Sequence, residues 1–208
     1  MRACRSLTLL AIPLVLAACQ DATAPVGREA SGPPQYSVSS STISVLRQAP
    51  TAPPLETYRL SFWAYVGKPA TVTVNYKPAP GQWVGAPFLR FAIPANGLVT
   101  GAGGTPLNYG DSVLVTLSVD SLAFAVHLDP SGVQFSPFFP ATLTLWYANA
   151  NPDVNGDGTV TGYDKYLLRQ LTLWYYGQTW TQLPSQNDPA LQYVATNLYH
   201  FSDYALSW

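Results

Sequence analysis

The sequence has little charge and almost no cysteine. Its 208 residues include 10 lysines and arginines against 11 aspartates and glutamates, and the formal net charge is −1 at pH 7. A chain without a basic excess has no field that would attract nucleic acid, so we expect no nucleic-acid partner. Of the two cysteines, Cys4 lies in an N-terminal leader, so we expect one cysteine in the mature chain and no disulfide. Stability must then come from the core or from a metal ion.

The residues of common catalytic centres are also scarce. The two histidines, His127 and His200, do not combine with serine, aspartate or cysteine into a recognisable nucleophilic centre, and we find no paired glutamates or phosphate-binding loop. We interpret His127 as structural. The sequence therefore predicts a protein that is not an enzyme, apart from one self-cleavage alternative near His200.

The long apolar run of the sequence lies at its N-terminus, from Leu7 to Ala18, after Arg2 and Arg5. A basic start, an apolar core and small residues at the end are typical of a secretory signal. The run is too short for a stable transmembrane span. We therefore expect residues 1–18 to be a signal peptide that is removed on export.

The end of this leader, Leu16-Ala17-Ala18-Cys19, resembles the lipobox of bacterial lipoproteins. The resemblance implies that Cys19 is thioether-linked to diacylglycerol and acylated at its amine, and two or more acyl chains anchor a protein stably. Gln20 after the cysteine, instead of aspartate, is similar to lipoproteins sent to an outer membrane. We therefore expect a membrane-anchored protein of the bacterial cell envelope. The alternative is an ordinary secretory signal with a chance cysteine.

Two segments follow the leader. Residues 19–56 are rich in serine, threonine, proline and alanine, which predicts a disordered, extended tether after the lipidated cysteine. Within it, Ile43, Val45 and Leu46 would be the residues of a short strand if one formed. Residues 57–208 are long enough for one domain.

Apolar and polar residues alternate with a period of two through this domain. Five segments show the pattern clearly: 58–64, 72–76, 113–119, 141–147 and 171–175. Turn-forming sequences separate the segments, namely KPAPG, PANG, DPSG, YGQT and PSQND. Several short strands at this spacing predict an all-β fold, an antiparallel β-sandwich. Residues 162–171, GYDKYLLRQL, are the only helix-like segment, so we expect one short helix after an acidic loop.

Four stretches of the domain occur in an order that resembles the ZU-five domain. They are FLRFAIPANGL, LDPSGVQFSPFFPATLTLWY, WTQLPS and LYHFSDYALSW, within residues 85–208. This family is a β-sandwich module of ankyrins, netrin receptors and tight-junction scaffolds, and it also occurs in exported bacterial lipoproteins. The resemblance implies a module that binds partner proteins and has no general catalytic centre, although a fold alone names no partner.

The stretch DVNGDGTVTGYD, from Asp153 to Asp164, is a candidate calcium loop. Calcium takes six to eight oxygen ligands, which an EF-hand loop supplies from positions 1, 3, 5, 7, 9 and 12, with glycine at 6. Gly158 stands at the sixth position. The residues at the ligand positions are Asp153, Asn155, Asp157, Thr159, Thr161 and Asp164. The loop also resembles a dockerin repeat, because a strand rather than a helix is predicted before it. We expect one Ca²⁺ ion with a structural role.

The alternative to a calcium site is a polar turn, since Asn-Gly and Asp-Gly favour turns without any metal. Against this alternative, three of the few aspartates fall within twelve residues, and without a cation their like charges would repel each other. The loop has no partner loop and ends in aspartate instead of glutamate. We therefore expect weak binding, with Kd on the order of 10⁻⁴–10⁻³ M.

The sequence His200-Phe201-Ser202 provides an enzymatic alternative. In some ZU-five and related autoproteolytic domains the chain cleaves itself between the phenylalanine and the serine of this motif. The resemblance implies Ser202 as the nucleophile and His200 as its candidate base. The other interpretation is a final strand in which Phe201 and Tyr204 pack, and we expect the Phe201–Ser202 bond to stay intact.

The aromatic residues provide a further alternative, a carbohydrate-binding module. Neighbours on a strand point to opposite faces, so one member each of Trp146-Tyr147 and Trp174-Tyr175 would be exposed. An exposed row of Trp63, Trp146 and Trp174 would stack on sugar rings. Our leading expectation is a lipid-anchored module for binding or envelope structure, with an envelope protein or a polysaccharide as its partner.

Overall fold

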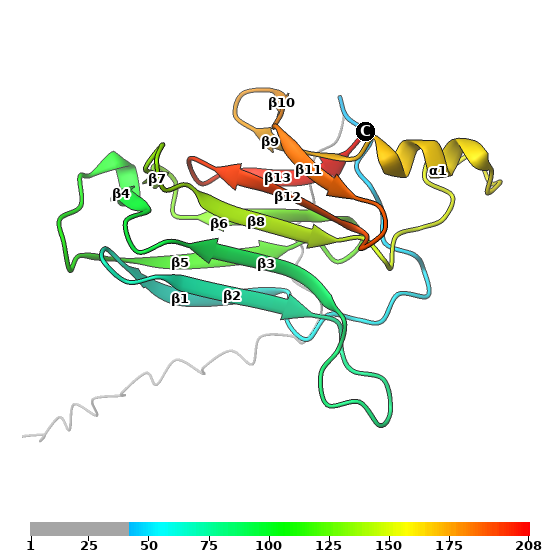
Figure 1. The fold of residues 1–208 in the computed structure, drawn as a ribbon, viewed down its shortest axis with the longest axis horizontal. Coiled ribbons are helices and arrows are strands. Elements are labelled where there is room, and N and C mark those ends of the chain that lie inside the picture. Colours follow the sequence, from blue (N-terminus) through cyan, green and yellow to red (C-terminus); the bar gives the residue numbers. More distant parts are fainter. Residues whose placement is uncertain (1–41) are drawn as a thin grey trace, which may run out of the picture. The chain divides into compact units, whose positions relative to one another are not determined.

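The computed structural model describes residues 42–208 (Figure 1). The predicted signal peptide, the candidate lipidation site Cys19 and most of the predicted tether lie outside these residues. The described part is built from antiparallel strands with a single short α-helix, so the prediction of an all-β, sandwich-like fold is confirmed. Within residues 42–208, no helix is both long enough and apolar enough to cross a membrane.

Two antiparallel sheets contain most of the strands. The six-stranded sheet has the order β1 (Arg59–Tyr65), β5 (Ser112–Val119), β6 (Ala125–Asp129), β13 (Asp203–Ser207), β9 (Thr172–Tyr176) and β10 (Trp180–Gln182). The five-stranded sheet has the order β11 (Ser185–Asp188), β12 (Tyr193–Leu198), β8 (Ala141–Trp146), β3 (Pro87–Ile93) and β2 (Ala70–Asn75). A small pair is formed by β4 (Leu98–Thr100) and β7 (Gln134–Phe135), near the 3₁₀ turn η1 (Ala102–Gly104).

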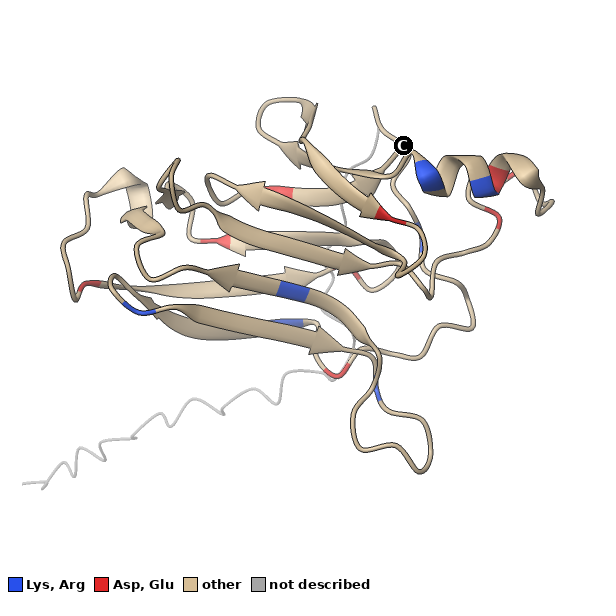
Figure 2. Ribbon diagram, viewed as in Figure 1, with Lys and Arg blue, Asp and Glu red and all other residues tan. Residues whose placement is uncertain are grey.

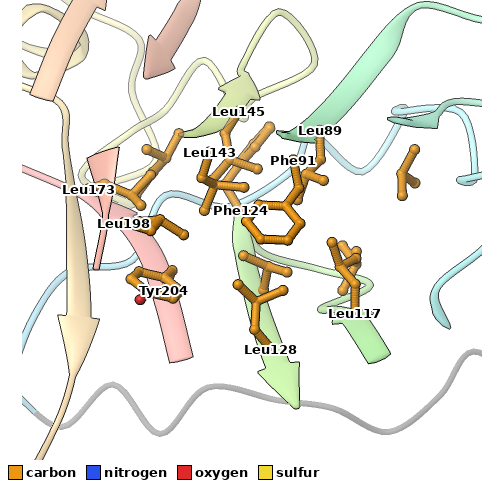
Figure 3. Packing of buried hydrophobic residues seen from close by; sticks show 14 of the residues in the cluster. Leu89, Phe91, Leu117, Phe124, Leu128, Leu143, Leu145, Leu173, Leu198 and Tyr204 are labelled. Atoms are coloured by element: carbon orange, nitrogen blue, oxygen red, sulfur yellow. The ribbon is translucent and has the colours of Figure 1, made fainter. Parts of the chain in front are cut away.

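The core lies between the two large sheets. Every second residue of β5 and of β8 is buried, as the period of two requires for strands with one face on a core. Phe124, in the connection between β5 and β6, stacks on Phe88 with ring centroids 5.4 Å apart. Figure 3 shows leucines of both sheets around Phe124, including Leu117 and Leu143.

The five segments with clear alternation all form strands, namely β1, β2, β5, β8 and β9. The helix-like segment forms α1 (Gly162–Arg169). The prediction of a turn at PSQND is wrong, because these residues form β11, which pairs with β12 from Ser185 opposite Thr196 to Asp188 opposite Tyr193. Turn-forming residue types yield here to backbone hydrogen bonding with β12, the next strand along the chain, and the turn of this hairpin lies in residues 189–192 instead.

The last part of the predicted tether packs on the sandwich. Leu46 and Leu55 are buried in the core, and the Leu46 amide donates to the Leu206 carbonyl at 2.9 Å. Leu55 forms a single-residue bridge with Tyr76, just after β2. The folded domain therefore begins before the predicted boundary at residue 57. The isolated apolar residues of this segment fill gaps at the end of the sandwich, although they make no periodic pattern.

Candidate functional site

The acidic loop connects β8 to α1, and buried side chains hold both of its ends. Before the loop, the buried Tyr147 donates from its hydroxyl to Asn187 Oδ1 of β11 at 2.9 Å. The amide of the same Asn187 donates to the carbonyls of Leu168 and Leu171 at the end of α1, at 2.9 and 3.2 Å. Val154 inside the loop is also buried. The loop is therefore fixed to the five-stranded sheet by one shared polar residue.

Asp153 organises the first half of the loop. Its Oδ1 accepts from the Gly156 and Asp157 amides at 2.9 and 3.1 Å, and its Oδ2 accepts from the Gly158 amide at 2.8 Å. Gly156 and Gly158 have φ angles of 74° and 88°, in the left-handed region that suits glycine. The Asn-Gly and Asp-Gly pairs thus let the chain curl around one carboxylate.

Asp157 and Asn155 form a second, exposed cluster. Asp157 Oδ1 accepts from the amide and the hydroxyl of Thr159 at 2.9 and 2.7 Å. Its Oδ2 accepts from Asn155 Nδ2 at 2.8 Å. The Thr159 hydroxyl, followed by Asn155, holds the pKa of Asp157 below its usual range. This carboxylate is therefore ionised at neutral pH on the surface of the loop.

Asp164, at the end of the loop, has a structural role at the start of α1. Thr161 and Asp164 form a capping box, in which each residue satisfies an amide near the helix N-terminus. Asp164 Oδ2 accepts from the Thr161 amide and hydroxyl at 2.7 and 3.1 Å, and Oδ1 accepts from the Val154 and Asn155 amides at 2.8 and 3.4 Å. Only 1% of the residue is exposed. These bonds, led by that from the Thr161 amide, lower the pKa of Asp164.

The structure thus brings the six candidate calcium residues into one loop but divides their roles. Asn155 and Asp157 are exposed and Asp153 is half-buried, and the carboxylates of Asp153 and Asp157 each accept three hydrogen bonds. Asp164 is buried, and each of its two oxygens accepts two hydrogen bonds. In the described part of the chain, no three histidine, cysteine, aspartate or glutamate side chains are grouped closely enough to hold a metal. The side-chain oxygens of Asp153, Asn155 and Asp157, at loop positions 1, 3 and 5, are ligands that suit a hard cation such as Ca²⁺. Closure of the site by position 12 would require Asp164 to release part of its capping contacts.

The candidate autoproteolytic residues do not form a nucleophile–base pair. The Ser202 hydroxyl donates to the carbonyl of Tyr176 on the neighbouring strand β9. His200 Nδ1 lies 3.2 Å from the Phe201 carbonyl oxygen, and the His200 ring packs against Tyr175 at 4.9 Å between centroids. Phe201 is buried against Phe135. The arrangement is that of a packed strand end. Self-cleavage would require the Ser202 hydroxyl to attack the Phe201 carbonyl carbon, but the hydroxyl is directed at the Tyr176 carbonyl.

The three tryptophans proposed as a sugar-stacking row are not in a row. Trp146 lies in β8 of the five-stranded sheet and is half-buried against Tyr193, with the ring centroids 6.2 Å apart. Trp63 and Trp174 lie in β1 and β9 of the other sheet, with three strands between them. Trp63 is 55% exposed, whereas the Nε1 atom of Trp174 is buried without a hydrogen-bond partner. Only Trp63 of the three is a free stacking surface.

A different constellation appears on the outer face of the six-stranded sheet. His127 of β6 lies between two carboxylates, with Nδ1 2.6 Å from Asp203 Oδ1 and Nε2 2.9 Å from Asp129 Oδ2. The hydrogen bond that the His127 ring makes to the Asp203 carboxylate is the main cause that raises the pKa of His127, and the second carboxylate, Asp129, adds to it against the opposing effect of burial. Ser118 of β5 lies opposite His127 on its other side. The interpretation of His127 from sequence did not include these partners.

Aromatic residues continue this line of residues across the sheet. Tyr176 of β9 is opposite Asp203 and is 43% exposed. Trp180 of β10 is opposite Tyr176, and their ring centroids are 5.3 Å apart. The outer-face row is therefore Ser118, His127, Asp203, Tyr176 and Trp180, with Asp129 beside it. Trp63 and the exposed Leu114, which are paired across β1 and β5, lie toward the edge of the same face.

Part of this row has a local signal in the sequence. His127 and Asp129 are two residues apart on a strand and so share a face. Asp203 stands 76 positions later, and only the pairing of β6 with β13 brings it to His127. The row can accept and donate hydrogen bonds beside aromatic rings, and it contains no oriented nucleophile. No protein-family model, curated protein or solved structure matches this chain.

Proposed function

We propose that this protein is a lipid-anchored binding module of the bacterial cell envelope, and that the outer-face row is its binding surface. The observation that supports this proposal best is the row itself, in which an exposed Tyr176 lies directly opposite Asp203, whose carboxylate is held by His127. Residues that face each other on paired strands are about 5 Å apart, so one small ligand unit can contact both.

A polysaccharide is the ligand whose chemistry suits this row. Carboxylates accept hydrogen bonds from hydroxyl groups, and an aromatic face covers the apolar face of a sugar ring. Asp129 and Asp203 are held in place by His127, so little side-chain entropy is lost on binding. The binding module and the carbohydrate-binding module, which were separate expectations, are therefore combined in one proposal. The proposed binding residues are those of the outer-face row instead of Trp63, Trp146 and Trp174. The ZU-five resemblance remains part of the proposal as a description of the module type.

Co-sedimentation with insoluble envelope polysaccharides tests this function. We expect Tyr176→Ala and Asp129→Asn each to weaken binding by about tenfold, as for a central contact of an interface. Tyr109→Ala is the matched control, because Tyr109 is an exposed tyrosine in the loop before β5. Equal binding by all three variants would contradict a sugar site on this face. Loss of a protein from an envelope pull-down in the same two variants would instead indicate a protein ligand.

A further inference from the structure

The loop between β2 and β3 exposes a tryptophan almost completely. Eight consecutive exposed residues, 77–84, lie between the buried Tyr76 and the buried Gly85. Trp83 is 98% exposed and the neighbouring Val84 is 66% exposed. Figure 1 shows this loop projecting beyond the ends of β2 and β3. Exposing an apolar ring to water costs free energy, and this cost is removed when the ring is buried against another molecule or a membrane.

The base of the loop is tightly held. Tyr76 packs edge-on against Phe88 at 5.7 Å, and its amide donates to the Ala86 carbonyl at 2.9 Å. A Cβ atom at Gly85 would lie 1.7 Å from the Tyr76 carbonyl oxygen, so only glycine allows this close approach. The loop therefore leaves the sandwich at a fixed place and in a fixed direction.

The tip is ordered by a turn. The Gln82 amide donates to the Ala79 carbonyl at 2.9 Å, and Gly81 at the third position has a φ of 85°. Proline at the second position and glycine at the third are typical of a type II turn. Trp83 follows directly after this turn. The tryptophan is thus presented by a loop with restricted conformational freedom.

The base of the loop is also bonded to the segment through which the chain enters the domain. The Lys77 amide donates to the Pro54 carbonyl at 2.8 Å, and the Glu56 amide donates to the Asn75 carbonyl at 2.9 Å. Residues 20–41 between the candidate anchor and the described part can extend to at most about 75 Å. A connection of that reach does not by itself determine which face of the domain is turned to the membrane.

We propose that residues 77–84 are a membrane-contact loop, in which Trp83 and Val84 enter the interfacial region of the lipid bilayer. Tryptophan favours the headgroup level of a bilayer, where its ring is buried and its indole NH stays hydrogen-bonded. Lys77 is the only charged residue of the loop, and Figure 2 shows no acidic residue in the connection between β2 and β3. The tip of the loop, residues 78–84, carries no charge, so it has no charged group to desolvate at the bilayer interface, and Lys77 and Glu56 stay at its base. This inference rests on the proposed lipid anchor, to which the loop adds a second, orienting contact.

The test measures the depth of Trp83 on a membrane. The full lipidated chain is reconstituted in phosphatidylethanolamine–phosphatidylglycerol vesicles with bromine atoms in the acyl chains, which quench nearby tryptophans. We expect wild-type fluorescence to be quenched and Trp83→Phe to lose most of that quenching, because phenylalanine keeps the loop apolar and removes the reporter. Trp63→Phe is the matched control and should leave the quenching unchanged, since Trp63 is exposed on the outer face of the six-stranded sheet.

Two results would overturn the inference, and they differ in whether the proposed lipid anchor is also contradicted. If the chain floats with the vesicles but Trp83 remains accessible to aqueous iodide, the loop does not contact lipid while the anchor survives; a protein partner would then be the candidate for Trp83. If the chain does not float with the vesicles, the anchor itself fails and the loop inference fails with it.

Discussion

His127 is the residue whose interpretation changes most when its contacts in the structure are added to its sequence context. Alone in FAVHLDP it is one histidine on a strand, but in the fold it joins the carboxylates of Asp129 and Asp203. Each aspartate attracts the protonated ring, so the pKa of His127 is raised above its ordinary value. The three side chains are only partly buried, so solvent reduces the strength of this pairing.

The raised pKa predicts a pH-dependent stability with a defined sign. A histidine whose pKa is higher in the folded state stabilises that state. Its contribution is complete at pH values below the unfolded pKa of about 6.5 and is lost as the pH rises through the folded pKa. We therefore expect the melting temperature to fall as pH is raised through that interval, by a contribution of about 1 kcal/mol or less. The comparison of wild type with Asp203→Asn measures it, because asparagine keeps an acceptor but removes the charge.

An NMR titration provides the direct check. The chain has two histidines, so the ring signals of His127 and His200 can be assigned by single substitution. A pKa of His127 at or below 6.5, or an Asp203→Asn variant with unchanged pH dependence, would contradict the electrostatic explanation.

At the scale of elements, the acidic loop and α1 form one unit. Asp164 closes the loop onto the helix through the capping box, and Asn187 joins the helix end to β11. Asp153 and Asp157 lie outside that capping arrangement, Asp153 half-buried and Asp157 exposed. The loop therefore contains a structural carboxylate and two carboxylates that remain candidates for a cation.

This division predicts different results for the aspartate variants. We expect calcium at about a hundred times Kd to raise the melting temperature by several degrees. Asp153→Ala with Asp157→Ala should remove the calcium-dependent rise. Asp164→Ala should lower the melting temperature with and without calcium, because it removes hydrogen bonds to four donors. Differential scanning calorimetry with metal-free protein measures all three.

Magnesium is the control, since it requires a tighter octahedral site and should raise the melting temperature less. Absence of any melting shift or binding heat up to about 10 mM calcium, well above the expected weak range, would leave the loop as a polar connection held by its own hydrogen bonds.

At the scale of the whole molecule, the ends of the described chain meet. Val45 bridges Ser207, and the Ser207 hydroxyl donates to the Ser44 carbonyl at 2.9 Å. The first described residues are thus fastened to the last strand of the six-stranded sheet.

The proposed lipid anchor at Cys19 makes a prediction about the location of the protein. Cys19→Ser should block processing at the lipobox or release the chain from the membrane fraction, because the acyl chains provide the stable attachment. Cys4→Ser is the matched control and should change neither processing nor location. Fractionation with mass spectrometry of the mature N-terminus in the native host measures both. An unlipidated N-terminus at a residue other than Cys19 would contradict the proposal.

The sequence by itself determined the features that depend on neighbours along the chain. The alternation of apolar and polar residues predicted five of the strands, β1, β2, β5, β8 and β9, because a strand with one buried face has a period of two. The helix after the acidic loop was also predicted, from the helix-like segment 162–171. The structure adds its cap, Thr161 and Asp164, which are three residues apart and so form another local contact. Gly156 and Gly158 likewise marked the left-handed turns of the loop.

Only the tertiary structure decided the features that depend on strand pairing. Leu46 and Leu55 joined the core although no periodic pattern surrounds them. The outer-face row required β6, β13 and β9 to be neighbours, which places Asp203 beside His127 across 76 positions. Such contacts depend on the order and register of strands, which a period of two leaves undetermined because every register that keeps the apolar face inward satisfies it equally.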